Sequence, residues 1–216
     1  MPMPVLPVPQ FKALPPLSLY VHIPWCLKKC PYCDFNSHEI REQGSQALED
    51  DYVKALIRDL ETALPDIWGR RLSTIFFGGG TPSLFSANAI DTLLTAIRML
   101  LPVEHFAEIT LEANPGTFEA QKFADYRKAG INRLSIGIQS FNRQHLQALG
   151  RVHDDQEAHR AVEIAMKNFD NINLDLMYAL PRQSLQEAQQ DIETACALGV
   201  THVSAYHLTL EPNTLF

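Results

Sequence analysis

The chain has 216 residues, enough for one large domain or two small ones. Hydrophobic residues make up 46% of it and charged residues 20%, so it can bury a sizeable core. Its formal net charge is −7 and it has no long basic run, which argues against binding to a nucleic-acid backbone. No stretch approaches the ~18 consecutive apolar residues that a transmembrane helix needs.

The N-terminal segment 1–16 is rich in proline and holds six of the 14 prolines. It lacks a basic start followed by an apolar run, so it does not resemble a secretory signal. We predict an extended arm over 1–16 and a folded domain over 17–216. Without an export signal, the protein is expected in the cytoplasm with reduced cysteines, which favours a metal or cluster site over disulfides.

Six apolar segments of strand-forming composition recur along the chain, with helical patterns between them. They span Leu17–Ile23, Thr74–Phe77, Glu108–Glu112, Arg133–Gln139, Asn171–Met177 and His202–Leu210. This alternation indicates the α/β class, with a mainly parallel sheet covered by helices on both faces. Six βα units are too few to close an eight-stranded barrel. A partial (β/α)6 barrel, open on one side, fits better than a doubly wound sheet, although periodicity alone does not decide between them.

Capping residues mark several predicted helix boundaries. Ser86 is expected to cap the N-terminus of one helix. Thr117 is expected to open another, which Gly130 ends. Asp154 and Ser184 each precede a glutamate by three residues, which is the capping-box spacing.

Three of the four cysteines lie within eight residues, at Cys26, Cys30 and Cys33. A 4Fe–4S cube has four irons, so three thiolates leave one iron open to a small molecule. From the residues alone, two alternatives stay open. One is plain free thiols, and the other is a zinc site with His22 or His38 as the fourth ligand.

The fourth cysteine, Cys196, lies far from this loop in the last predicted helix. It is assigned to one helical face with Ala188, Ile192 and Ala195. We therefore expect a buried, inert thiol.

Other polar or glycine-rich positions follow the predicted strands, where loops form the site in either architecture. Gly78–Gly80 either lets the backbone approach a ligand or makes a tight turn. Glu112 and Asp175 end or interrupt apolar strands, where an unpaired carboxylate is costly. They either form salt bridges, for example with Arg133 or Arg151, or bind hydroxyl and amino groups of a ligand.

Together these residues resemble the radical S-adenosylmethionine (SAM) superfamily, and within it the oxygen-independent coproporphyrinogen III oxidase-like proteins. The resemblance covers the chain from about residue 17 to residue 216. The segments that carry it are Leu17-Ser-Leu-Tyr-Val-His-Ile-Pro-Trp-Cys26, Cys30-Pro-Tyr-Cys33-Asp-Phe-Asn36, Phe77-Gly-Gly-Gly-Thr-Pro-Ser83, Leu111-Glu-Ala-Asn-Pro-Gly116, Leu134-Ser-Ile-Gly-Ile-Gln-Ser-Phe141, Leu149-Gly-Arg-Val-His153 and Asn173-Leu-Asp-Leu-Met177.

The resemblance implies a partial (β/α)6 barrel with a 4Fe–4S cluster held by Cys26, Cys30 and Cys33. It further implies that SAM chelates the open iron, that a donor such as flavodoxin or ferredoxin supplies an electron, and that cleavage of SAM gives a 5′-deoxyadenosyl radical. The implied SAM contacts are Tyr20, Tyr32, Gly79, Gly80, Thr81, Glu112, Gln139, Arg151 and Asp175.

Phe35 separates this chain from the oxidase pattern, which resembles CxxxCxxCxC with a further cysteine at this place. The chain resembles instead the HemW-type branch, haem chaperones that bind haem and hand it to recipient haemoproteins. The oxidase reaction of porphyrin biosynthesis is the alternative, and a structural zinc domain is a third. The family's C-terminal haem-binding region is absent here, so we expect a truncated chain or impaired haem handling. The resemblance does not decide whether this chain cleaves SAM as an enzyme.

Overall fold

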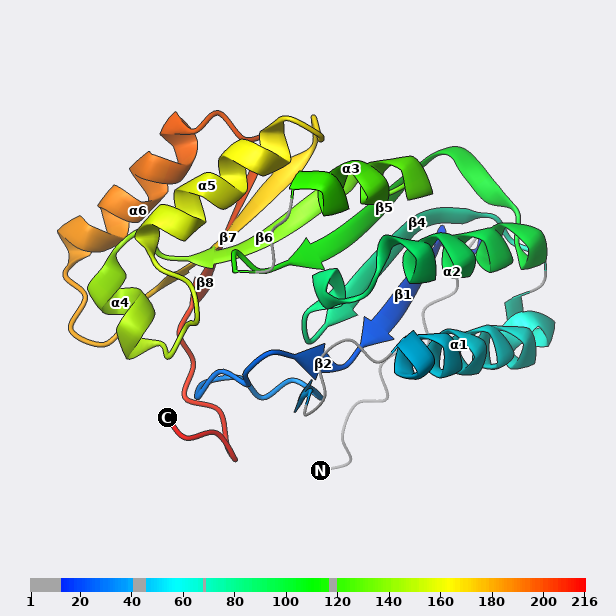
Figure 1. Cartoon of the computed structure of the whole chain (residues 1–216), viewed down its shortest axis with the longest axis horizontal. Helices are drawn as coiled ribbons and strands as arrows, with labels where there is room; N and C mark the ends of the chain where they lie inside the picture. Colours follow the sequence, from blue (N-terminus) through cyan, green and yellow to red (C-terminus); the bar gives the residue numbers. More distant parts are fainter. Residues whose placement is uncertain (1–12, 41–45, 68, 117–119) are drawn as a thin grey trace, which may run out of the picture.

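The computed structural model describes residues 13–40, 46–67, 69–116 and 120–216 (Figure 1). Its main sheet has six strands in the order β1-β4-β5-β6-β7-β8, and all neighbouring pairs are parallel. The strands are β1 (Leu17–Ile23), β4 (Leu72–Gly79), β5 (Val103–Ala113), β6 (Arg133–Gln139), β7 (Ile172–Tyr178) and β8 (His202–His207). Each connection therefore moves one strand further along the sheet, and the predicted α/β fold with its mainly parallel sheet is confirmed.

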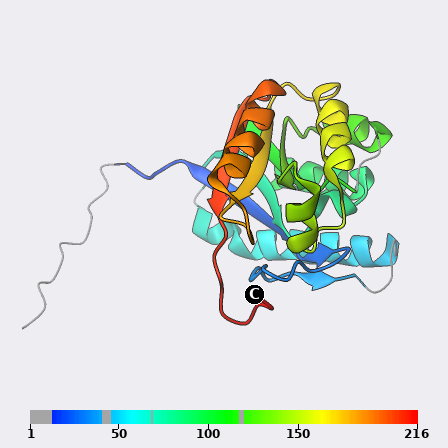
Figure 2. The same cartoon turned by 90° about the vertical axis from the view of Figure 1, so that its left-hand side faces the viewer.

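The longer helices lie beside one another on the outside of the curved sheet (Figures 1 and 2). They are α1 (Gln46–Ile67), α2 (Ala87–Leu100), α3 (Ala120–Ala129), α5 (Asp155–Met166) and α6 (Leu185–Ala197), with the short α4 (Arg143–Ala148) after β6. Contacts join α1 to α2, α2 to α3 and α3 to α5. The prediction that helices cover both faces of the sheet is wrong.

The reason is the two-residue period of the strands, which sends successive side chains to opposite faces. In β6, Leu134 and Ile136 are fully buried in the core between sheet and helices. The alternate residues Ser135 and Gly137 line a cavity on the other face. Only the first face needs a helical cover, because burying each large apolar side chain contributes roughly 1.5–3 kcal/mol.

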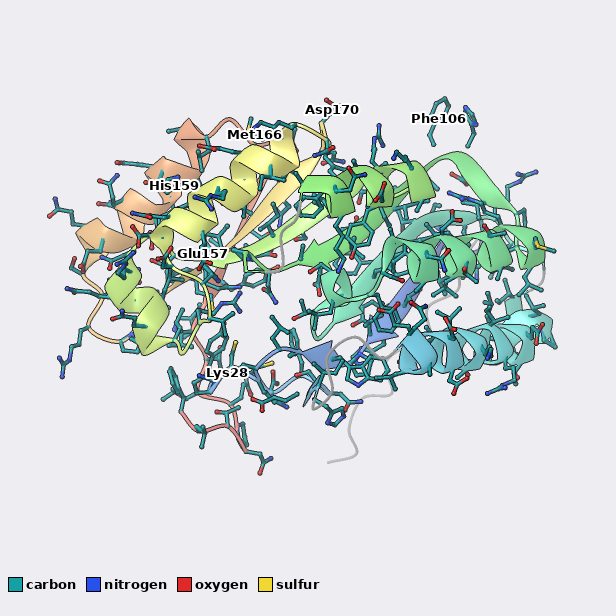
Figure 3. The ribbon with its side chains drawn as sticks, viewed as in Figure 1. Lys28, Phe106, Glu157, His159, Met166 and Asp170 are labelled. Carbon is teal, nitrogen blue, oxygen red and sulfur yellow. The ribbon has the colours of Figure 1, made fainter. Side chains whose placement is uncertain are left out.

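Several predicted helix ends are confirmed. The Ser86 hydroxyl accepts from the Ala89 N–H at the start of α2. Asp154 and Ser184 form complete capping boxes, the first with Glu157 at the start of α5 (Figure 3). Gly130 follows α3 with a φ of 113°, a left-handed conformation that favours glycine.

The prediction for Cys196 is wrong. The buried positions of α6 are Asp191 and Ala195, and Cys196 is exposed. Ile192, which was assigned to the same face, is also 40% exposed. One residue corresponds to about 100° around a helix, so Cys196 turns away from the sheet when Ala195 faces it.

Parts of two predictions lie outside the described residues. These are most of the N-terminal arm and the helix start at Thr117. In the described part of the chain, no helix combines the length and apolarity needed to cross a bilayer.

Replacing Ser184 by alanine removes the side chain that accepts from the Glu187 N–H at the start of α6. Loss of such a cap costs about 1 kcal/mol, and we expect this decrease in the free energy of unfolding in urea denaturation. Ser184→Asp recreates the Asp-x-x-Glu box found at Asp154 and should retain most of the stability. Equal losses in both variants would contradict the capping explanation.

Candidate functional site

The carboxyl ends of the strands and the loops after them surround a cavity of about 470 Å³, a size typical of small-molecule sites. Except for Tyr20, every site residue predicted from the sequence lines it: Cys26, Cys30, Tyr32, Cys33, Gly79, Gly80, Thr81, Glu112, Gln139, Arg151 and Asp175. Tyr20 is 56% exposed, and its hydroxyl pairs with His22 Nδ1 at 3.1 Å.

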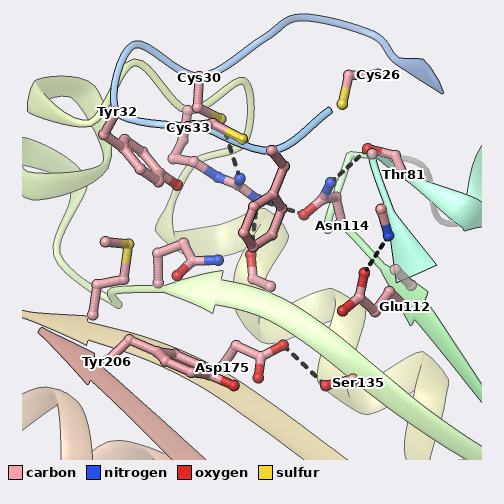
Figure 4. A pocket seen from close by; sticks show the side chains of 18 of the residues that line it. Cys26, Cys30, Tyr32, Cys33, Thr81, Glu112, Asn114, Ser135, Asp175 and Tyr206 are labelled. Carbon is pink, nitrogen blue, oxygen red and sulfur yellow. Dashed lines mark hydrogen bonds between the residues drawn. The ribbon is translucent and has the colours of Figure 1, made fainter. Parts of the chain in front are cut away.

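The cysteine loop is closed by its own backbone. Two short strands that the sequence did not predict, β2 (Trp25–Cys26) and β3 (His38–Glu39), pair in parallel at its base. Within the loop, the Cys33 N–H donates to the Cys30 carbonyl at 3.0 Å. The Lys29 ammonium donates to backbone carbonyls of the same loop, that of Phe35 among them. These bonds place the three cysteines above one cavity (Figure 4).

The glycine motif after β4 anchors the start of the cysteine loop. The Gly80 N–H donates to the Ile23 carbonyl at 2.8 Å, and the Thr81 N–H donates to the Trp25 carbonyl at 2.7 Å. A Cβ at Gly80 would lie 2.6 Å from the Trp25 oxygen. The close backbone approach at Gly80 is therefore to the chain itself, which needs a residue without a side chain.

Burial and hydrogen bonding act in opposite directions on Cys26. Burial raises the pKa of its thiol, while hydrogen bonds with Thr81 and Ser37 favour the thiolate. Ser37 is itself buried and lies 3.9 Å from Cys33 Sγ. Two of the three thiols thus have hydroxyl partners at the edge of the cavity.

The donor set fits an iron–sulfur cube. In the part of the chain that the structure describes, no three His, Cys, Asp or Glu side chains gather around a position for a single metal ion. The thiolates of a cube each bind a different iron, so they surround a wider space than ligands of one ion. The candidate zinc ligands His22 and His38 do not line the cavity, and His22 Nε2 pairs with the Asn36 carbonyl.

Arg151 brings a positive charge to the cysteines. Its Nη1 donates to Cys30 Sγ at 3.5 Å, and its Nη2 donates to Asn114 Oδ1 at 2.7 Å and to the Gly137 carbonyl at 2.9 Å. Its Nε is buried and has no hydrogen-bond partner among the described residues. A buried donor without a partner is costly.

Two carboxyl groups lie deeper in the cavity. Glu112 accepts from the Gly79 N–H at 3.2 Å, and Asp175 accepts from Ser135 at 2.9 Å and from Asn173 at 2.8 Å (Figure 4). Burial, reinforced by Asp175, raises the pKa of Glu112 to about 7. Burial also raises the pKa of Asp175, against its hydrogen bonds.

Salt bridges do not explain these carboxylates. The ion pair that Arg133 forms is with Glu108, at 3.8 Å, and Arg151 is directed at Cys30. Within the described ranges, neither Glu112 nor Asp175 takes part in an ion pair of 4.0 Å or less. Both remain available to a ligand that carries hydroxyl or amino groups.

Tyr32 connects the cysteine loop to the far side of the sheet. Its ring packs against a separate apolar cluster that contains Leu149, Met177, Leu180 and Leu208. Burial raises the pKa of its hydroxyl, against the charge of Arg151. The phenol therefore stays neutral beside Arg151 and the cysteines.

Gln139 lies at the end of β6 with a φ of 68°, a conformation that side chains other than glycine rarely adopt. The pairing register with β7 shifts between Gly137 and Gln139. This irregularity places Gln139 in the cavity lining. Such strain is found mostly at functional sites.

Sequence reasoning missed several polar residues that line the cavity. These are Asn114, Arg133, Ser135, Asn173, Ser204 and Tyr206. The two-residue alternation of side chains along a strand could have identified two of them. Asn114 lies two positions after Glu112, and Asn173 two positions before Asp175, so each is directed to the same face as its carboxylate.

A comparison with protein families gives a match to the Radical SAM superfamily over residues 20–195. The chain belongs to the radical SAM superfamily. Membership implies a 4Fe–4S cluster and SAM, and the cavity has thiols, carboxylates and an arginine where such groups would bind.

This radical SAM chain is similar to two curated proteins called "Heme chaperone HemW". One, from Escherichia coli (strain K12), is 54% identical over 204 residues, which are 94% of this chain and 53% of that protein. The other, from Haemophilus influenzae, is 53% identical over 208 residues, with shares of 94% and 54%. The chain thus spans about half the length of these relatives.

The fold is similar to a solved structure described as "Coproporphyrinogen III oxidase (HemN) from Escherichia coli is a Radical SAM enzyme". The TM-score is 0.82 at 31% sequence identity, with 93% of this chain and 46% of that chain covered. The likeness supports the assignment of the barrel and its cavity. This chain has Phe35 two residues after Cys33, where the oxidase pattern described above has a further cysteine.

The raised pKa of Glu112 predicts that stability depends on pH. The native chain holds the Glu112 proton more tightly than the unfolded chain does, because the pKa of this carboxyl group in an unfolded chain is its ordinary value of 4.5. Stability is therefore lost as pH rises from about 4.5 to about 7, by up to roughly 3 kcal/mol. The side-chain oxygen of Glu112→Gln can still accept from Gly79, but the group no longer titrates. Urea denaturation should therefore show a smaller decrease in the free energy of unfolding from pH 5 to pH 8 in this variant than in the parent. Parallel losses in parent and variant would contradict the assignment.

Proposed function

We propose that residues 17–216 form the radical SAM core of a haem chaperone of the HemW type. The observation that carries the proposal is the convergence of the three cysteines with Glu112, Asp175 and Arg151 on a single cavity. The 54% identity to the heme chaperone HemW of E. coli supports haem handling as the purpose. Haem is cargo in this proposal, and a haemoprotein is its recipient.

Cys26, Cys30 and Cys33 would hold the 4Fe–4S cluster and leave one iron for SAM. When bound, the cluster supplies an electron at low potential for the cleavage of SAM, and flavodoxin or ferredoxin is the proposed donor. The irregular loop suits this role because its turns are closed by backbone bonds and by Lys29.

The rest of the cavity supports binding of SAM. Arg151 lines the cavity beside Cys30, and its positive charge would attract the carboxylate of SAM. Glu112 and Asp175 would accept hydrogen bonds from hydroxyl or amino groups. The contacts proposed from the resemblance are Tyr32, Gly79, Gly80, Thr81, Glu112, Gln139, Arg151 and Asp175. A contact with Tyr20 stays a prediction, because its hydroxyl is held by His22 outside the cavity lining.

Anaerobic reconstitution tests the cluster. We expect about four irons and four sulfides per chain, and a change in the electron paramagnetic resonance (EPR) spectrum of the reduced protein when SAM is added. Serine in place of Cys26, Cys30 or Cys33 should abolish the intact cluster. Cys196→Ser is the matched control, because this thiol is exposed on α6, and it should retain full iron content. About one zinc per chain without iron would contradict the proposal.

Haem titration tests the chaperone part. We expect a saturable Soret absorbance change for this chain when it is extended with the C-terminal half of the E. coli relative, and a weaker change for residues 1–216 alone. The comparison separates haem contacts of the core from those of the added half. An extended chain that binds no haem would contradict the proposal.

The oxidase alternative has its own readout. Phe35 lines the cavity and is 58% exposed, so the place of the oxidase cysteine faces the site with an apolar ring. We expect no decarboxylation of coproporphyrinogen III in an anaerobic assay with SAM and a reductant. Formation of product would favour the oxidase over the chaperone.

A further inference from the structure

A network of hydrogen-bonded side chains crosses the mouth of the cavity from Cys30 to Thr81, which faces Cys26. Arg151 donates to Cys30 Sγ at 3.5 Å and to Asn114 Oδ1 at 2.7 Å. Asn114 Nδ2 then donates to Thr81 Oγ1 at 2.8 Å (Figure 4). The Thr81 hydroxyl is near enough to Cys26 to favour its thiolate. Asn114 is the centre of this network, because it bonds both Arg151 and Thr81.

The direction of the bonds follows from the chemistry of the groups. A guanidinium has donors only, so the carbonyl oxygen of the Asn114 amide must face Arg151. The amide nitrogen then faces Thr81 and occupies a lone pair of its hydroxyl oxygen. This leaves the Thr81 hydrogen free to be donated to Cys26, so both ends of the network offer a donor to sulfur.

We propose that Asn114 is a positioning residue that raises the reduction potential of the cluster by directing Arg151 at Cys30 and Thr81 at Cys26. The inference rests on the proposed function, because it needs a cluster on these cysteines. Reduction adds negative charge, which hydrogen bonds to sulfur and a nearby guanidinium stabilise. Without Asn114, Nη2 of Arg151 would lose one of its two acceptors among the described residues and keep the Gly137 carbonyl.

Asn114 also lines the cavity, so a direct contact with SAM is the competing explanation. The two explanations differ in a measurable way. A SAM contact changes the affinity for SAM, whereas a positioning role changes the potential of the cluster when SAM is absent. The experiment is therefore a redox titration without SAM.

Asn114→Leu replaces the amide by an apolar group of similar size. In an EPR-monitored titration of the reconstituted chain with titanium(III) citrate, we expect about a tenfold smaller ratio of reduced to oxidised cluster at a fixed potential. This corresponds to a midpoint lower by about 59 mV for one electron. Thr81→Val should shift the midpoint in the same direction, and Thr81→Ser, which keeps the hydroxyl, should titrate like the parent.

Asn132→Leu is the matched control. Like Asn114, Asn132 bridges two groups through its amide, but both are backbone groups: it accepts from the Ile109 N–H at 2.7 Å and donates to the Ala107 carbonyl at 2.8 Å. It lies at the opposite end of the strands. It should lower stability and leave the midpoint unchanged. An equal shift in this control would show a general effect of destabilisation and overturn the inference.

Two further outcomes separate the inference from the proposed function. If the parent takes up a cluster and both Asn114→Leu and Thr81→Val titrate at the parent's potential, the inference fails and the proposed function stands. The same holds if Asn114→Leu changes only the affinity for SAM. If the parent takes up no iron, both fail together.

Discussion

The two-faced character of the parallel strands is the constraint on which the rest of this structure depends. Successive side chains point to opposite faces, so each central strand gives one face to the helices and the other to the cavity. The polar groups of the cavity face are costly to bury unless they are paired. They pair with one another: Ser135 donates to Asp175, Asn173 donates to both, and Ser204 donates to Asn173. The interior is thus a fixed polar lining.

The cysteine loop depends on this sheet for its position. It begins where β1 ends, and the backbone after β4 binds its first residues through Gly80 and Thr81. On the opposite side, Tyr32 packs on a small apolar cluster beside β7 and β8. The loop is irregular, yet it is fixed at both ends by elements of the barrel. A site on a loop gains its precision from such support.

Charge is distributed unevenly along the cavity. Arg151 lies at the cysteines, whereas Glu112 and Asp175 lie deeper, where burial raises the pKa of both and Asp175 adds to the rise at Glu112. Coulomb interactions are stronger in a cavity of low dielectric than in water. A ligand with an acidic group near the cysteines and hydroxyl or amino groups further inside would satisfy both ends, as the proposed binding of SAM requires.

The sequence alone determined the chain order and type of the six strands of the main sheet, because six apolar segments of strand-forming composition leave little choice once helices separate them. It also determined the caps at Ser86, Asp154 and Ser184, whose bonds reach only three residues along the chain. The cysteine spacing and the residues after each strand pointed to the cavity before its walls were known. These features depend on neighbours in the chain, so a local pattern contains them.

Only the tertiary structure decided which face the helices cover, that Cys196 is exposed, and that Tyr20 lies outside the cavity lining. It also revealed Asn114 as the link between Arg151 and Thr81, which come from separate strand ends. Periodicity shows that two faces exist but not which one is covered. That depends on how parallel strands curve and on contacts between residues distant in the chain, which no local pattern encodes.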